Sequence, residues 1–240
     1  MITSVSRPLH IGIIAGSVEG AALCYRTIVL ESEQYLGEYD HPRITLDNLP
    51  LAEYSRALGS DDLQSVAALL QRSLAALSLA GADFAICPDN TFHVALPSLE
   101  AQAIPLIGII DVVADEARER GYRRVGVLGT RITMESTLYS HALGRLGIEA
   151  VTPDAQERAV VDGLLQQELV KGRFTNEARE VFQAVIGSLA ARGCDAVALA
   201  CTEIPLLISP TDSALPTLDS TRLLAHAALR RALRVDARVR

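Results

Sequence analysis

The 240-residue sequence lacks the features that mark membrane spans, nucleic-acid binders and metal centres. Its apolar stretches are broken by Gly, Pro and charged residues before they reach the roughly 18 residues of a membrane-spanning segment. Its net charge of −7 argues against binding to nucleic acid, which requires an excess of Lys and Arg. Its four cysteines include no C-x-x-C pair, so we expect no zinc or iron–sulfur site.

Two further absent features concern the cellular location of the protein and the binding of nucleotides. The first eight residues lack the charged and then apolar plan of a signal peptide, so we expect a cytoplasmic protein with reduced thiols. The first apolar run is not followed by G-x-G-x-x-G, and the chain contains no Walker sequence, so a nucleotide site is not expected. By contrast, apolar residues make up 49% of the chain, which is ample for a packed core.

Apolar runs of strand length alternate with amphipathic stretches of helix length along the whole chain. The expected strands cover residues 9–15, 43–46, 84–87, 106–110, 125–128, 149–151, 196–200 and 216–218. The expected helices cover residues 20–36, 61–79, 94–102, 112–120, 133–146, 155–171, 177–191 and 221–233. Continuous apolar strands indicate burial on both faces. The pattern predicts an α/β protein with doubly wound parallel sheets.

Two peptides at the ends of expected strands match each other. Residues 83–91 (DFAICPDNT) and 195–203 (DAVALACTE) align without gaps on their leading aspartates. Asp89 then falls opposite Cys201. A duplicated strand that ends each time in a proton-active side chain suits a reaction on two faces of one small molecule.

The duplication extends to other segments. Residues 10–17 resemble 124–130, and residues 105–111 resemble 215–219, in the same order and at nearly the same separation. We therefore expect two pseudo-symmetric lobes, residues 1–110 and 111–218, with a C-terminal helix at 219–235 available to complete the first. Because ligands of open α/β sheets bind beyond the carboxyl ends of the strands, the cleft between the lobes is the expected active site.

Two residues are the expected acid–base pair. Cys201 ends a strand before Thr202 and Glu203, at the start of a helix-forming segment, where the helix dipole favours a reactive thiolate. Asp89 becomes a useful base if burial beside negative groups raises its pKa, and it is equally suited to cap a helix. The two roles are compatible. Cys87 lies one strand step deeper and is expected to support the site from behind.

Small turns precede two of the expected helices. Gly16-Ser17 and Gly129-Thr130 place a hydroxyl beside free backbone N–H groups, which favours an anion such as a substrate carboxylate. Ordinary strand–helix turns give the same pattern.

At these residues the chain resembles the aspartate/glutamate racemase superfamily, which also contains hydantoin racemases, maleate isomerases and arylmalonate decarboxylases. The resemblance rests on Asn90-Thr91-Phe92-His93, on residues 200–205 (ACTEIP) and on residues 167–172 (QELVKG), and it covers nearly the whole chain. It implies two pseudo-symmetric lobes, no cofactor, a frequent homodimer, and two cysteines that flank the substrate's α-carbon. In the cysteine-pair racemases a Cys directly precedes Asn-Thr, whereas this chain has Asp89 there.

The same resemblance implies an Arg after the second strand and a Lys near a helix end, which hold the side-chain carboxylate of acidic substrates. Arg56 and Lys171 are the matching residues, and Arg43 and Arg131 are the alternatives. Each could instead be a solvated surface cation.

Together these observations predict a cofactor-independent racemase of aspartate- or glutamate-like amino acids, with Cys201 and Asp89 acting on opposite faces of the α-carbon. A decarboxylase or cis–trans isomerase of small dicarboxylates that uses Cys201 alone is one alternative, and a non-catalytic small-molecule-binding protein is another. The expected substrate-binding residues are Ser17, Asn90, Thr91, Thr130, Thr202, Glu203, Arg56 and Lys171.

Overall fold

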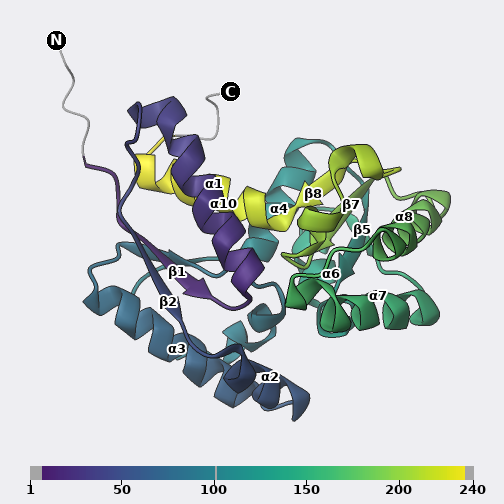
Figure 1. Ribbon diagram of the computed structural model, residues 1–240, viewed down its shortest axis with the longest axis horizontal. Helices are drawn as coiled ribbons and strands as arrows, with labels where there is room; N and C mark the ends of the chain where they lie inside the picture. Colours follow the sequence, from purple (N-terminus) through teal and green to yellow (C-terminus); the bar gives the residue numbers. More distant parts are fainter. Residues whose placement is uncertain (1–6, 101, 236–240) are drawn as a thin grey trace.

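The computed structural model describes residues 7–100 and 102–235, which form two α/β lobes side by side (Figure 1). The first sheet contains β1 (Ile11–Ala15), β2 (Ile44–Asn48), β3 (Phe84–Ile86) and β4 (Leu106–Ile107), in the order β2-β1-β3-β4. The second sheet contains β5 (Arg124–Gly129), β6 (Glu149–Val151), β7 (Ala196–Ala200) and β8 (Thr217–Asp219), in the order β6-β5-β7-β8.

All neighbouring strands in both sheets are parallel, and the two strand orders are the same. The predicted fold of two pseudo-symmetric parallel-sheet lobes is therefore confirmed.

Helices cover the sheets. The α-helices are α1 (Val18–Leu36), α2 (Leu51–Gly59), α3 (Leu63–Leu79), α4 (Ile109–Glu119), α5 (Arg131–Glu135), α6 (Leu138–Gly144), α7 (Ala155–Gln167), α8 (Asn176–Ala191), α9 (Ile204–Leu207) and α10 (Ser220–Leu233). The 3₁₀ turns are η1 (Thr91–Ser98), η2 (Leu169–Lys171) and η3 (Pro210–Asp212).

The structure corrects several predicted boundaries. Ile109 and Ile110 were expected in a strand, but they begin α4 after Gly108. The expected helix 133–146 is broken into α5 and α6, because the Ser136 hydroxyl bonds back to the carbonyl of Thr133 and competes with the helical backbone. The expected helix 94–102 is the turn η1, and residue 101 lies outside the described residues. Helix α2 was not expected.

The two lobes exchange helices. Helix α10 follows the last strand of the second lobe, yet it packs against α1 and α4 of the first (Figure 1). Helix α4 in turn packs against α6 and β8. A shared core consequently includes Ile13 and Cys24 from one lobe and Val127 and Ala198 from the other. The lobe boundary at residue 110 stays a prediction.

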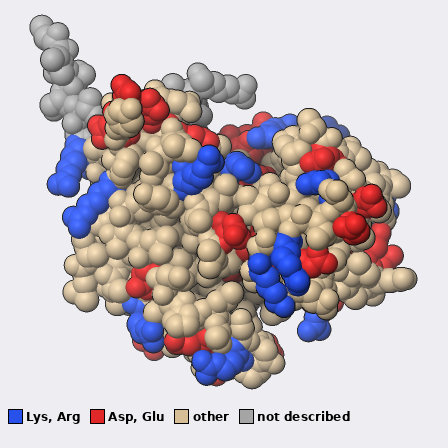
Figure 2. Space-filling model, in the orientation of Figure 1, with Lys and Arg blue, Asp and Glu red and all other residues tan. Residues whose placement is uncertain are grey.

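The surface charges and the helix lengths concern the expectation that the protein binds no nucleic acid and spans no membrane. On the face shown in Figure 2, basic and acidic side chains are interspersed, without a large patch of one sign. Within residues 7–100 and 102–235, every helix is too short or too polar to cross a membrane.

Candidate active site

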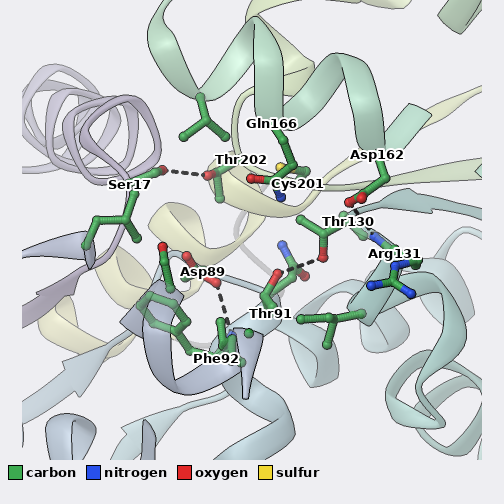
Figure 3. A pocket seen from close by; sticks show the side chains of 18 of the residues that line it. Ser17, Asp89, Thr91, Phe92, Thr130, Arg131, Asp162, Gln166, Cys201 and Thr202 are labelled. Atoms are coloured by element: carbon green, nitrogen blue, oxygen red, sulfur yellow. Dashed lines mark hydrogen bonds between the residues drawn. The ribbon is translucent and has the colours of Figure 1, made fainter. Parts of the chain in front are cut away.

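A cavity of about 550 Å³ opens between the lobes, beyond the carboxyl ends of the central strands (Figure 3). The turns after β1 and β3 line one side, and the turns after β5 and β7 line the other. The structure brings together these predicted site residues: Ser17, Asp89, Asn90, Thr91, Thr130, Cys201, Thr202 and Glu203.

Two glycines allow close approaches at this cavity, Gly20 between the lobes and Gly16 within the first lobe. A Cβ atom on Gly20, in the first turn of α1, would lie 2.2 Å from Thr202 Oγ1. A Cβ atom on Gly16 would lie 2.7 Å from Asp89 Oδ2. Because real Cβ atoms do not approach other atoms so closely, a side chain at either position would force the turns apart.

Cys201 and Glu203 form a buried pair. The Cys201 thiol donates to Glu203 Oε2 at 3.1 Å, and the Thr202 hydroxyl donates to the same oxygen at 3.1 Å. Glu203 is 1% exposed, and its Oε1 has no hydrogen-bond partner among the described residues. Burial raises the pKa of Cys201 well above its ordinary value, and the negative charge of Glu203 raises it further.

The prediction that Cys201 is a thiolate is therefore wrong for the resting site, where its sulfur holds the proton. The following helix, α9, has only four residues, so its dipole is too small to offset burial beside a carboxylate.

Asp89 both bonds to a turn and has a shifted pKa. Its Oδ1 accepts the backbone N–H of Phe92 at 3.1 Å, at the start of η1. Burial raises the pKa of Asp89 to about 7, the Phe92 hydrogen bond opposes the rise, and the charge of Glu203 adds to it. The upward shift of the pKa agrees with the expectation, Asp89 bonds to the turn from the residue before its N-cap position, and the catalytic role stays a prediction.

Hydroxyl groups from the two lobes meet in pairs across the cavity. Ser17 Oγ lies 3.3 Å from Thr202 Oγ1, and Thr91 Oγ1 lies 2.9 Å from Thr130 Oγ1 (Figure 3). Ser17 and Thr130 also cap α1 and α5, so both hydroxyls are held in place by backbone N–H groups. Such an array of hydroxyls can bind a carboxylate.

The Asn90 side chain joins the lobes. Its Oδ1 accepts from the Tyr139 hydroxyl at 2.8 Å, and its Nδ2 donates to Ser220 Oγ at 3.1 Å. Ser220 donates to the carbonyl of Leu199 at 2.8 Å. The amide predicted to hold substrate is thus largely occupied by the second lobe, and it positions the turn that carries Asp89.

His93 is a structural residue that holds the turn after β3. Its Nδ1 lies 2.8 Å from the carbonyl of Asp89, and its Nε2 accepts the backbone N–H of Ile109 at 3.2 Å. Burial lowers the pKa of His93 to about 4, so the ring is neutral at pH 7. In the described part of the chain, the His, Cys, Asp and Glu side chains do not form a group of three that could hold a metal ion.

Three predicted residues lie outside the cavity lining. Arg56 is exposed on the outer face of α2, where its Nε donates to the carbonyl of Ala52. Lys171 is exposed at the end of η2. Cys87 is 1% exposed in the first lobe's own core, behind Asp89. Arg131 is the one predicted alternative cation that lines the cavity.

Sequence reasoning missed the wall contributed by α7. Asp162 and Gln166 line the cavity from this helix, and Asp162 Oδ1 accepts the backbone N–H of Arg131 at 2.8 Å (Figure 3). In the sequence both residues look like part of a solvated helix face. The buried neighbours Val161 and Leu165 mark the adjacent inward face, but they do not show that it borders a ligand cavity.

Comparisons with known proteins agree on one family. The family model described as Asp/Glu/Hydantoin racemase matches residues 11–228. The broad specificity amino-acid racemase RacX of Bacillus subtilis (strain 168) is 24% identical over 223 residues, covering 90% of this chain and 95% of RacX.

Solved structures of racemases also superimpose on this chain. A candidate Asp/Glu racemase from Yersinia pestis superimposes with a TM-score of 0.85 at 33% identity, covering 94% of this chain and 99% of that one. The aspartate racemase of Picrophilus torridus superimposes with a TM-score of 0.79 at 26% identity, covering 93% and 94%.

Proposed function

The chain belongs to the Asp/Glu/Hydantoin racemase family, and from this premise we propose that it racemises an α-amino acid by moving the α-proton between Asp89 and Cys201. One observation carries the proposal. A carboxyl group with a pKa of about 7 and a protonated thiol line the same cavity from two different lobes. Aspartate and glutamate are the substrates that the family suggests, and they serve as the reference compounds.

The protonation states suit a reaction that needs one base and one acid at a time. At neutral pH a large fraction of Asp89 is ionised, so its carboxylate removes the α-proton from one face of the substrate. The Cys201 thiol then gives its proton to the opposite face and becomes a thiolate. The other enantiomer reacts through the reverse steps. Because the two side chains supply both proton transfers, the proposed reaction requires no cofactor.

The surrounding groups have distinct roles. The hydroxyls of Ser17, Thr91 and Thr130 bind the α-carboxylate and stabilise the negative charge that builds on it as the proton leaves, and the Thr202 hydroxyl, which donates to Glu203, positions Ser17. Glu203 accepts the hydrogen bond of the Cys201 thiol and thereby orients the sulfur. Its second oxygen, Oε1, has no partner among the described residues and accepts from the substrate's ammonium group in the proposed complex.

Substitution of Cys201 tests the proposal. Cys201→Ala should lower the interconversion of the two enantiomers, followed by polarimetry, by at least about 100-fold, the typical contribution of a general acid or base, because both proton-transfer faces are needed for inversion. Cys194→Ala is the matched control, because Cys194 is also buried in the second lobe but does not line the cavity. Undiminished interconversion of the enantiomers in Cys201→Ala would show that the sulfur is not the acid–base group.

A decarboxylase is the second candidate, favoured by the protonated state of Cys201. A thiol can protonate an enediolate after loss of CO₂, and Asp89 would then only orient the substrate. Release of CO₂ from a malonate, without exchange of amino-acid α-protons, would select this reaction over racemisation.

A further inference from the structure

The part of the cavity that Asp89 and Glu203 do not occupy is rich in acids. Asp61, Glu135 and Asp162 line it, and Arg131 is the only Lys or Arg among the described lining residues. A substrate side chain in this cavity therefore meets three carboxylates and one guanidinium.

The existing contacts leave the negative charge of Asp162 available. Glu135 pairs with Arg158, whose Nε lies 3.4 Å from Glu135 Oε1. Asp162 receives its hydrogen bond from the backbone N–H of Arg131, which fixes the carboxylate without neutralising it. Among the described ion pairs, none includes Asp162 or Arg131.

The cavity also has apolar walls suited to an aliphatic chain. Leu51, Leu58 and Leu63 line it from the first lobe, and Ile132 and Val170 line it from the second. An alkyl stem can pack against such side chains while its charged end reaches an acid. Aspartate has one methylene group and would leave these walls uncovered.

The buried Glu203 accounts for the α-ammonium group that every amino-acid substrate carries, so the acids and the apolar walls are left to select the side chain. Glu203 lines the cavity, and its Oε1 is buried and has no hydrogen-bond partner among the described residues. A buried carboxylate oxygen without a donor is costly, and an ammonium group of the ligand would satisfy it.

We infer that the substrates of this site are amino acids with a cationic group on an aliphatic stem, such as lysine and ornithine, instead of aspartate and glutamate. The inference rests on the proposed racemase function and defines its substrate class. A second carboxylate on the substrate would meet Asp61 and Asp162 with Arg131 alone to offset them, whereas an ammonium group is attracted by these two acids.

A substrate series separates the charge from the stem. Deuterium exchange at the α-carbon is measured for lysine, ornithine, norleucine, glutamate and aspartate, where norleucine has the stem without the charge. We expect kcat/KM for lysine to exceed that for glutamate at least tenfold, with norleucine between them. Faster exchange of glutamate or aspartate, or equal rates for lysine and norleucine, would overturn the inference while leaving the racemase intact.

Binding measurements distinguish the two proposals when exchange is absent. Calorimetric binding of lysine but not glutamate, without α-proton exchange in any of the five compounds, would keep the substrate class and reject racemisation. Absence of both binding and exchange would reject both.

One substitution tests the acid itself. Asp162→Asn keeps an Oδ1 acceptor for Arg131 but removes the charge, and it should lower the ratio of kcat/KM for lysine to that for norleucine by about two- to fivefold. Asp115→Asn removes the same charge from an exposed position on α4, outside the cavity, and should leave the ratio unchanged. If the ratio of kcat/KM for lysine to that for norleucine is the same in both variants and in the unsubstituted protein, Asp162 does not select the substrate.

Discussion

At the residue scale, burial together with the charge of Glu203 determines the protonation states of Asp89 and Cys201. Burial raises the pKa values of Asp89 and Cys201, and the charge of Glu203 reinforces both shifts. For the carboxyl group the shift brings the pKa into the neutral range, where it can act as a base and as an acid. For the thiol the shift keeps the proton in place. Glu203 therefore acts on both proposed catalytic groups, although of the two it contacts only Cys201 through a hydrogen bond.

The pKa of Asp89 predicts the pH dependence of the reaction. A raised carboxyl pKa means that Asp89 is protonated, and inactive as a base, below about pH 7. The kcat/KM for exchange of norleucine should therefore rise about tenfold per pH unit well below pH 7 and level off above it. Because enantiomers have equal free energies in solution, both should show the same profile.

An NMR exchange assay between pH 5 and pH 8.5 measures this profile. Asp89→Asn should remove the rising limb together with most of the activity. A parent profile that is flat over this range would exclude Asp89 as the ionising group.

The sequence predicted which residues meet, but not all of their states. The duplicated peptides placed Asp89 and Cys201 in one cleft, since parallel strands end at a common edge. The direction of the Cys201 shift depends on how Glu203 folds back onto the sulfur, which a linear sequence does not show. Arg56 and Lys171 were misplaced because the side of α2 and η2 that faces the cavity is set by tertiary packing.

At the element scale, the close approach of α1 to the turn after β7 is a requirement of the site. Gly20→Ala would place a methyl group 2.2 Å from Thr202 Oγ1, so the helix start and the Cys201 turn must separate. We expect this variant to lose exchange activity at least tenfold, because misplacement by about 1 Å can cost a factor of about 100.

A matched glycine supplies the control. Gly187 lies inside α8, and a Cβ atom there would meet no atom within 4 Å. Gly187→Ala should raise the free energy of unfolding by about 0.5–1 kcal/mol, measured by urea denaturation, and leave exchange unchanged. Full activity in Gly20→Ala would show that the contact with Thr202 is not needed.

The elements themselves were largely predictable. Apolar runs identified the eight strands of the described residues, and glycines with φ of 85° at Gly81 and 83° at Gly193 follow α3 and α8. Predictions failed where local hydrogen bonds compete with periodicity, as at Ser136. They also failed for α2, whose few buried side chains, Tyr54 and Ala57, give a weak signal.

At the scale of the whole molecule, duplication and exchange of helices place the cavity between two lobes that cannot be separated. Helices α4 and α10 each follow the last strand of one sheet and pack against elements of the other lobe. The internal repeat was readable from sequence, whereas the number of shared contacts was not, because amphipathic helices do not show which sheet they cover. The homodimer and the cytoplasmic location stay predictions.

The shared core predicts that both lobes unfold together. The chain offers natural reporters, because Cys24 lies in the shared core, Cys87 in the first lobe's own core and Cys194 in that of the second. Unfolding of one lobe alone would expose the other lobe's half of the shared core, which leaves a large apolar surface in water. Thiol labelling in increasing urea, followed by mass spectrometry, should therefore give the three cysteines the same opening free energy within about 1 kcal/mol.

A substitution in α10 sharpens this test. Leu224 is fully buried in the shared core, so Leu224→Ala should lower the unfolding free energy by about 2–5 kcal/mol. Because α10 packs against elements of both lobes, the urea concentration at which Cys87 and Cys194 become labelled should fall by the same amount for both. A shift confined to one of these cysteines would mean that the lobes are independent folding units, and the cavity between them would then depend on docking of two preformed halves.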